Sequence, residues 1–329
     1  MKIAIVGCGA AGSVFASFLR KGGCDLTLVD PYAAHMDAVK ENGMSFTIAP
    51  DEHYTVTGFK TAHSAAEVVD ENGENIIMDG IIFVTKATIL RKAIEGAMPI
   101  IGKDTVLISL INGIGNDDIL CEYTTPDHVI FGSGVFGTFL NRPGACTASP
   151  GKEQYKMNFG PSEHSTFTDA VGQYLEECFC NGGCPAKYWD DVRPMVWKKA
   201  TDNCIFNPLT AMMRLKSKYL YDLEDGWPLI VGLASEVIAV ANAKGIKMSL
   251  EDYLQYQWDR RDAPIKNYYC SMAQDMLFHE RQTEIHTLNG VIARYGKELG
   301  IPTPYNEMIS HMVALTEKNY EHLFPKERD

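Results

Sequence analysis

The sequence predicts an α/β domain with a doubly wound parallel sheet, followed by an all-helical domain. A glycine-rich turn stands between an apolar run and a helical pattern at the start of the chain. Short apolar runs then alternate with helical patterns, which is typical of a parallel sheet with helices on both faces. Strand patterns fade near residue 190. We therefore expect residues 1–189 to form the first domain and residues 190–329 the second.

The glycine-rich turn lies within MKIAIVGCGAAG, the first twelve residues. Lys2–Val6 is a short apolar strand pattern, and Gly7-x-Gly9-x-x-Gly12 leads from it into a helix, as a Rossmann-type dinucleotide turn requires. The helix N-terminus offers unpaired N–H groups to phosphates. An ordinary strand-to-helix turn is the alternative. We assign cofactor binding to Gly7, Cys8, Gly9, Ala10, Ala11 and Gly12.

Asp30 ends the second apolar run, residues 26–29, and lies 18 residues after Gly12. A carboxylate at this place accepts hydrogen bonds from the ribose hydroxyls and repels a 2′-phosphate, which favours NAD(H). The alternative for Asp30 is a turn residue before Pro31.

The other elements follow from the same patterns. Further strands are expected at 80–85, 105–111 and 129–132, and helices at 12–20, 35–42, 87–97 and 117–121. The glycine-rich stretch 134–160 predicts antiparallel strands that close the edge of the sheet. In the second half, helical stripes are formed by Leu229, Ile230, Leu233, Val237 and Ile238, and by Ile285, Leu288 and Ile292. Gly245 marks the expected end of the first of these helices.

Composition narrows the class of protein. The net charge of −12 argues against nucleic acid or an anionic membrane as the main partner. No apolar run approaches the roughly 20 residues of a membrane span, and we interpret the N-terminal apolar run as a strand rather than a signal peptide. Nine scattered cysteines indicate reduced thiols in the cytoplasm. The cluster Cys178, Cys180 and Cys184 lacks zinc spacing, so we expect a buried helix end and no metal.

A polar ridge is predicted in the segment VWKKATDNCIFNPLTA, residues 196–211. Lys199, Asn203 and Asn207 are spaced i, i+4 and i+8 and so share one helix face. Pro208 is expected to end or kink this helix. The ridge either faces a cleft or is a solvated face, and this segment alone does not decide between them.

Two other segments favour the cleft. Asn112 follows a predicted parallel strand, and the carboxyl ends of such strands are where ligands bind in this architecture. Ser271 and Glu284, in SMAQD and TEI, can supply a hydroxyl and a carboxylate.

These segments, in this order, resemble the ketopantoate reductases (2-dehydropantoate 2-reductases) over nearly the whole chain. The motifs that carry the resemblance are GCGAAG, VTK ending at Lys86, INGIG around Asn112, WKK to NPLTA around Lys199, CSMAQD around Ser271 and TEI around Glu284, with NG at 289–290. The resemblance implies a 6-phosphogluconate dehydrogenase-like C-terminal domain and a homodimer.

The resemblance also implies roles for single residues. Lys199 matches the catalytic lysine, and Glu284 the glutamate that interacts with it and with the substrate hydroxyl. Asn203 and Asn207 match amides that hold the substrate, and Ser271 a serine near its carboxylate. Asn112 and Lys86 match residues near the cofactor, Asn112 also touching substrate. Lys198 falls outside the motif, and we interpret it as surface charge.

The chemistry agrees with these roles. Reduction of a 2-keto acid turns a carbonyl oxygen into an alkoxide, which a positioned ammonium stabilises and then protonates. Partial burial suits a lysine to this task because it lowers the pKa toward working pH.

The sequence departs from the family after the second strand. Many members use NADPH and carry a basic residue there, whereas this chain has Asp30-Pro31-Tyr32. We therefore expect NAD(H), with NADP(H) as the family-based alternative. Two interpretations of residues 255–267 stay open: a pocket wall in which Arg260 or Arg261 binds a carboxylate, and a solvated turn.

Three functions stay open. The first is reduction of ketopantoate to pantoate for pantothenate synthesis. The second is NAD-dependent reduction of another branched 2-keto acid. The third is a non-catalytic Rossmann nucleotide sensor, which would need neither Lys199 nor Glu284; a flavoprotein would need a further motif that the sequence lacks.

Overall fold

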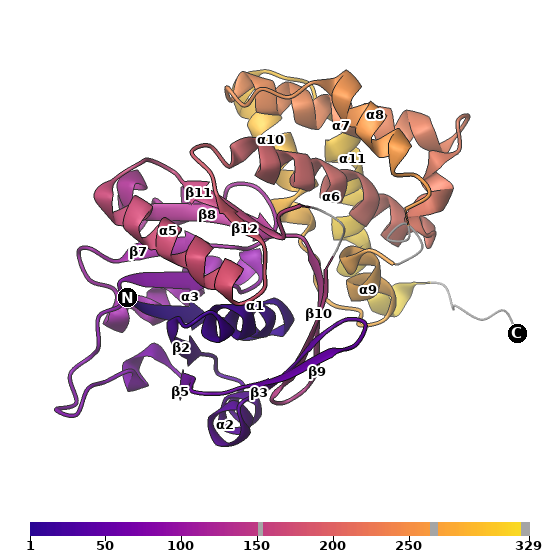
Figure 1. Ribbon diagram of the computed structural model, residues 1–329. Coiled ribbons are helices and arrows are strands. Elements are labelled where there is room, and N and C mark those ends of the chain that lie inside the picture. The colour runs from indigo at the N-terminus through magenta and orange to yellow at the C-terminus, as the bar shows by residue number, and fades with distance from the viewer. Residues whose placement is uncertain (151–153, 264–268, 324–329) are drawn as a thin grey trace, which may run out of the picture. The chain divides into compact units, whose positions relative to one another are not determined.

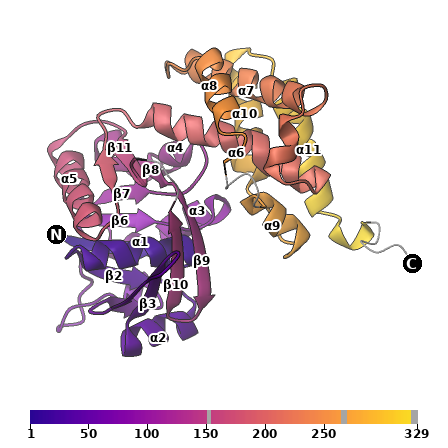
Figure 2. The ribbon, with the colours of Figure 1, turned by 45° about the vertical axis from the view of Figure 1, so that its right-hand side comes forward.

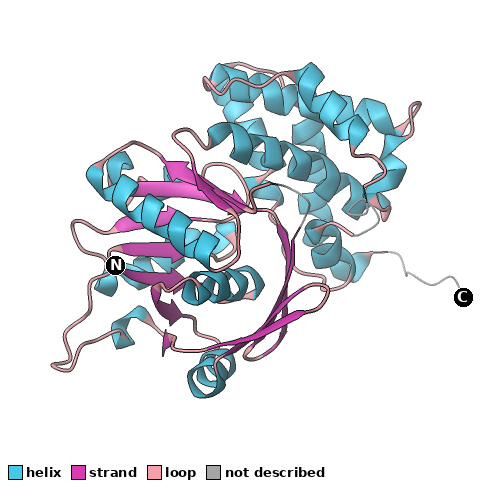
Figure 3. Ribbon diagram, viewed as in Figure 1, coloured by secondary structure: helices cyan, strands magenta, loops and turns pink. Residues whose placement is uncertain are grey.

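The computed structural model describes residues 1–150, 154–263 and 269–323 (Figure 1). The chain divides into two compact units, Met1–Val192 and Arg193–Asp329. Figure 3 shows that the strands of the described residues lie in the first unit and that the second is built from helices. The predicted α/β domain followed by an all-helical domain is thereby confirmed.

The main sheet of the first unit has eight strands in the order β12-β11-β8-β7-β6-β1-β2-β5. From β8 to β5 all neighbours are parallel, while β11 runs antiparallel to β8. The strands are β1 (Lys2–Val6), β2 (Asp25–Val29), β5 (Lys60–Ala62), β6 (Gly80–Phe83), β7 (Val106–Ser109), β8 (Val129–Gly134), β11 (Met157–Pro161) and β12 (Ala186–Tyr188). The five strands predicted from the sequence are all present.

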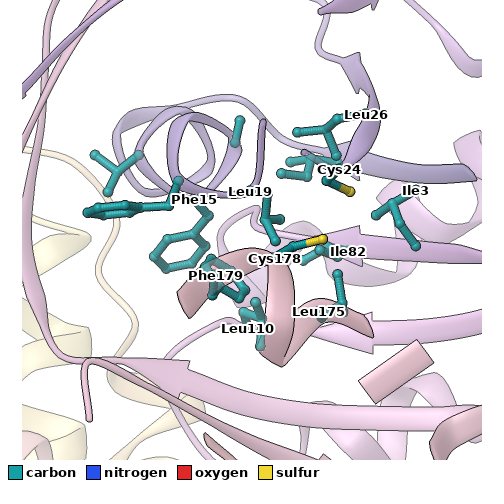
Figure 4. Packing of buried hydrophobic residues seen from close by; sticks show 14 of the residues in the cluster. Ile3, Phe15, Leu19, Cys24, Leu26, Ile82, Leu110, Leu175, Cys178 and Phe179 are labelled. Atoms are coloured by element: carbon teal, nitrogen blue, oxygen red, sulfur yellow. The ribbon is translucent and has the colours of Figure 1, made fainter. Parts of the chain in front are cut away.

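Helices cover both faces of this sheet. Because side chains alternate along a strand, Ile3 and Ile5 of β1 join one apolar cluster with α1 and α5, while Ala4 joins another with α3. In Figure 4, Leu19 of α1 and Phe179 of α5 lie within the first cluster. The helices are α1 (Ala10–Lys21), α2 (Ala33–Asn42), α3 (Leu90–Ala97), α4 (Asn116–Leu120) and α5 (Thr166–Asn181).

A second, four-stranded sheet has the order β4-β3-β10-β9. Its strands are β3 (Met44–Ile48), β4 (Glu52–Val56), β9 (Phe136–Arg142) and β10 (Ala145–Pro150). β9 and β10 form a hairpin that packs along α1 (Figure 2).

The second sheet corrects the interpretation of residues 134–160. Besides Gly134 at the end of β8, β11 is the part of that stretch that joins the main sheet. It pairs antiparallel with β8, as expected, but β12 and not β11 forms the edge. β10 pairs instead with β3, about 100 residues earlier in the chain. Local patterns do not encode such a distant partner, and neither β3 nor β4 was predicted from the sequence. Residues 151–153 lie outside the described part of the chain.

The second unit is helical throughout its described residues. Its helices are α6 (Arg193–Met213), α7 (Gly226–Ala243), α8 (Leu250–Asp259), α9 (Ser271–Leu277), α10 (Asn289–Leu299) and α11 (Pro304–Glu317). The first apolar stripe lies on α7, and Gly245 adopts a φ of +80° just after it. The second stripe belongs to two elements, because Ile285 lies in a short 3₁₀ turn and Ile292 in α10.

In the described residues, α7 is the one helix long and apolar enough to cross a membrane. Half of it is buried inside the unit. Glu236 near its middle accepts hydrogen bonds from the backbone N–H groups of Tyr305 and Asn306, at 2.8 and 2.9 Å. These contacts are those of a core helix.

Of the two outcomes expected at Pro208, an end or a kink of the ridge helix, the end is wrong. α6 continues through Pro208 to Met213. Residues on both sides of the proline, including Cys204, Ile205 and Leu209, are buried in the core. Tertiary packing therefore holds the helix together where local preference would stop it.

Candidate active site

The parallel strands of the first unit end on one line. The register pairs Val6 of β1 with Val29 of β2 and with Phe83 of β6, and pairs Phe83 with Ser109 of β7. The loops after this line carry every cofactor residue predicted from the sequence: the turn from Gly7, then Asp30, Lys86 and Asn112. The fold thus brings together four separate segments at the carboxyl edge of the sheet.

The glycine turn has the shape that a phosphate cradle needs. Gly7 has a φ of +95°, and a side chain there would meet the backbone of Val84 at 2.9 Å. A Cβ at Gly12 would overlap the carbonyl oxygen of Gly7, whereas a Cβ at Gly9 would meet no atom within 4 Å. α1 begins directly after Gly9, and no N-cap side chain binds its first N–H groups.

Asp30 is tied to that turn. Its Oδ2 accepts a 2.6 Å hydrogen bond from the backbone N–H of Cys8, and its Oδ1 accepts one of 2.8 Å from the N–H of Tyr32. A carboxylate has about four acceptor positions. These two N–H groups therefore fix the carboxylate and leave about two acceptor positions for other donors.

Ser13 and His35 hold the glycine turn through hydrogen bonds, and neither residue was predicted from the sequence. The Ser13 hydroxyl donates to the carbonyl of Cys8 at 2.8 Å, and His35 Nε2 lies 3.0 Å from that hydroxyl. Gly144 of the β9–β10 turn donates its N–H to His35 Nδ1 at 2.9 Å, so the ring proton is on Nε2. Burial lowers the pKa of His35, which is kept neutral. No sequence motif marks this histidine.

The loop after β7 is shaped by two glycines at positive φ, Gly113 (+111°) and Gly115 (+82°). The side-chain amide of Asn116 donates to the carbonyls of Ile111 and Asn112, at 3.2 and 3.4 Å. Asn112 is exposed on this loop. Asn116 was also missed, although its place one residue after the INGIG motif is a usable signal.

In the second unit, α6 presents the predicted ridge. Lys199 and Asn203 are half-buried and Asn207 is 7% exposed, while Trp197, Ala200 and Cys204 point into the core. The amide of Asn207 donates to the hydroxyl of Ser271, the first residue of α9, at 3.5 Å. The structure thus brings Asn207 and Ser271 together across two helices.

Glu284 stands on a fixed backbone. The N–H and the hydroxyl of the preceding Thr283 both donate to Glu317 of α11, at 2.8 and 2.7 Å. The carbonyl of Glu284 accepts from the hydroxyl of Thr287 at 3.0 Å. Glu284 itself is half-buried, and hydrogen bonds of its own backbone and of the preceding residue hold the segment that carries it.

A second polar face of α6 binds α8. Tyr253 donates to Asp202 at 2.6 Å, and Gln257 also donates to this carboxylate. Lys198 lies 3.4 Å from the centre of the Tyr256 ring, and burial lowers its pKa. The interpretation of Lys198 as surface charge is therefore wrong, because the ammonium packs on an aromatic face.

Arg260 and Arg261, which follow α8, contact aromatic residues of that same helix. Arg261 donates to the carbonyl of Trp258 at 2.9 Å and covers its ring, and Arg260 lies 4.8 Å from the ring centre of Tyr256. Positions 264–267 of this segment lie outside the described residues.

The cluster Cys178, Cys180 and Cys184 lies at the end of α5 and in the loop that follows it. Cys178 and Cys184 are buried, and Cys180 is exposed on α5. Within the described ranges, no group of three or more His, Cys, Asp or Glu residues is placed to hold a metal ion.

Comparison with known proteins finds a matching family model for each of the two units. A family model described as ketopantoate reductase PanE/ApbA matches residues 3–163, and its C-terminal counterpart matches residues 191–317. The 2-dehydropantoate 2-reductase of Lactococcus lactis is 28% identical over 319 residues, 97% of this chain and 98% of that protein. That of Streptococcus pyogenes serotype M1 is 29% identical over 317 residues, 96% of this chain and 98% of that protein.

Solved structures agree. A ternary structure of D-mandelate dehydrogenase with NADH and anilino(oxo)acetate has a TM-score of 0.83 and 26% identity, covering 98% of this chain and 99% of that one. A PanE/ApbA family ketopantoate reductase from Ralstonia eutropha JMP134 has a TM-score of 0.82 and 25% identity, covering 98% and 100%. With both family models matched in order along one chain, this protein belongs to the ketopantoate reductase family of oxidoreductases, which act on 2-keto acids.

Proposed function

We propose that this protein reduces ketopantoate to pantoate with a reduced nicotinamide cofactor, Lys199 acting as the general acid. The observation that carries the proposal is the ridge of Lys199, Asn203 and Asn207 on α6, with Asn207 against Ser271. One ammonium and two amides on one face of α6, with a hydroxyl at the start of α9, suit a small substrate with a carbonyl, a carboxylate and a hydroxyl. A nucleotide sensor would have no use for this set.

The residues of the first unit fit a dinucleotide. The turn Gly7–Gly12 leaves space over Gly9 and presents the N-terminus of α1, which suits a pyrophosphate. Asp30 keeps acceptor positions for ribose hydroxyls and places a negative charge where a 2′-phosphate would need a cation. We therefore propose NAD(H) as the preferred cofactor, with NADP(H) as the alternative. Bound, the reduced cofactor supplies the hydride.

Lys199 handles the charge that the reduction creates. As the keto carbon is reduced, its oxygen becomes an alkoxide, and the ammonium stabilises this oxyanion and donates a proton to it. Glu284, on its fixed backbone, is proposed to orient the ammonium and to bind the new hydroxyl. Asn203 and Asn207 orient the substrate without adding charge, Ser271 binds the carboxylate, and Asn112 and Lys86 serve the cofactor side.

A second candidate is another branched or bulky 2-keto acid. The likeness to D-mandelate dehydrogenase, solved with NADH and anilino(oxo)acetate, favours substrates with an aromatic substituent. It also supports NADH as the cofactor.

The test is the rate of NADH and NADPH oxidation by purified protein with ketopantoate and with a panel of branched and aromatic 2-keto acids. We expect ketopantoate to give the highest kcat/KM, with NADH. Preference for an aromatic keto acid would select the second candidate. Cofactor binding without turnover of any keto acid would contradict both.

A further inference from the structure

The hydrogen-bond ladder of α6 is broken inside the substrate ridge. Pro208 has no N–H, so it cannot give the carbonyl of Cys204, four residues earlier, the usual helical hydrogen bond, and a proline ring clashes with this carbonyl in a regular helix. The break falls between Asn203 and Asn207, which both belong to the ridge.

Asn289, the first residue of α10, supplies the missing donor. Its Nδ2 donates to the carbonyl oxygen of Cys204 at 2.8 Å and also to Oδ1 of Asn306 at 2.9 Å. Asn306 in turn donates to Glu236 of α7 at 2.7 Å. These three side chains are buried, Asn289 and Asn306 completely. A series of buried hydrogen bonds thus connects α6, at the break, with α10, α11 and α7.

The orientation of Asn289 is determined by its partners. Carbonyl and amide oxygens only accept hydrogen bonds, so both N–H bonds of the amide must face Cys204 and Asn306. Its own Oδ1 is buried and has no partner among the described residues. Because an unpaired buried acceptor is costly, the amide is retained here for its two donors.

We infer that Asn289 is a positioning residue for the substrate ridge. By holding the Cys204 carbonyl, it fixes how the half of α6 that carries Lys199 and Asn203 is set against the half that carries Asn207. This assignment of a role in substrate binding rests on the proposed function; the hydrogen bond itself does not.

The decisive experiment is a double-mutant cycle between Asn289→Leu and Pro208→Ala in the full-length protein. Pro208→Ala returns a backbone N–H to the helix and so gives the Cys204 carbonyl a partner of its own. We expect Asn289→Leu to raise the KM for the keto acid about 10- to 100-fold, since small misplacements of binding groups cost this much, with the Kd for NADH unchanged. Adding Pro208→Ala should recover most of that loss.

Asn242→Leu is the matched control. Asn242 also bonds the backbone twice through its side chain, at Met248, by 3.0 and 2.9 Å, and neither bond involves α6. It should lower the melting temperature and leave the KM unchanged. If Asn289→Leu behaves in the same way, or if Pro208→Ala brings no recovery, the positioning role is overturned. Asn289→Ala serves in the cycle should the leucine variant fail to fold.

A spectroscopic measurement separates this inference from the proposed function. In protein labelled with ¹⁵N-asparagine, the side-chain resonances of Asn203 and Asn207 should move in Asn289→Leu and return with Pro208→Ala, whether or not any keto acid is turned over. Unmoved resonances would overturn the inference even in an active enzyme. Moved resonances in a protein without keto acid reductase activity would overturn only the proposed function.

Discussion

Asp30 has two tasks at the level of a single residue. Its carboxylate accepts a hydrogen bond from the N–H of Cys8 in the glycine turn, and we propose that its charge also selects NADH over NADPH. Asp30→Ser keeps a short polar side chain but removes the charge. We expect the ratio of kcat/KM for NADH to that for NADPH to fall about 10-fold or more, as for lost hydrogen bonds to a charged group.

Asp25→Ser is a matched control for this prediction. Asp25 begins the same strand and pairs with Lys60 in solvent, and exposed ion pairs contribute little. The ratio of NADH to NADPH activity should not change in this variant. An unchanged ratio in Asp30→Ser as well would show that Asp30 does not select the cofactor.

At the scale of the element, two glycines of the turn between β1 and α1 have different tasks: Gly12 permits the packing of α1, and Gly9 is proposed to leave room for the cofactor. A Cβ at Gly12 would overlap the carbonyl oxygen of Gly7, whereas a Cβ at Gly9 would meet no atom of the described residues within 4 Å. Gly12→Ala should therefore lower the melting temperature because α1 can no longer pack on β1. Gly9→Ala should keep the melting temperature and weaken NADH binding, measured by fluorescence titration. Full NADH affinity in Gly9→Ala would mean that the pyrophosphate does not approach this turn.

The link from α2 to the glycine turn predicts a pH dependence of stability. Burial lowers the pKa of His35 from its ordinary 6.5, so below about pH 6.5 the unfolded chain binds a proton that the folded chain does not. The stabilisation is complete above that pH and is lost as the pH falls through the folded pKa. Protonation also prevents Nδ1 from accepting the N–H of Gly144.

Urea unfolding of wild type and His35→Gln from pH 7.5 to 5 measures this effect. Both lose stability from other groups, but the wild type should lose more over this range. Parallel curves would show that His35 does not carry the titration.

At the scale of the whole molecule, the sequence predicts those elements that have a short, regular pattern of apolar residues. The parallel strands, the α1 turn and the helical second half follow from short apolar patterns, and the family motifs identify the ridge on α6. Pairings between distant segments do not follow from such patterns. β3 and β10 pair across about 100 residues, and the Asn289–Cys204 bond joins residues 85 positions apart.

Local preference also failed where tertiary contacts override it. Pro208 indicates a helix end or a kink, yet α6 continues through it. Packing in the buried core and the hydrogen bond from Asn289 to the carbonyl of Cys204 stabilise the helix there. Lys198 and Lys199 are adjacent and look alike in sequence, but Lys198 is held on the Tyr256 ring.

A further prediction at this scale concerns the number of chains in the assembled protein. The family resemblance implies a homodimer, so light scattering of the purified protein should give twice the chain mass. A single chain mass at micromolar concentration would contradict the dimer and leave the site assignments unaffected.

The most direct test of the account compares Lys199→Met with Lys198→Met in ketopantoate reduction. Both variants remove one ammonium from neighbouring positions of α6. We expect Lys199→Met to lower kcat by about 100-fold or more, with the Kd for NADH unchanged, and Lys198→Met to retain kcat within a few-fold. Equal kcat in wild type and Lys199→Met would contradict the central claim that this lysine supplies the proton.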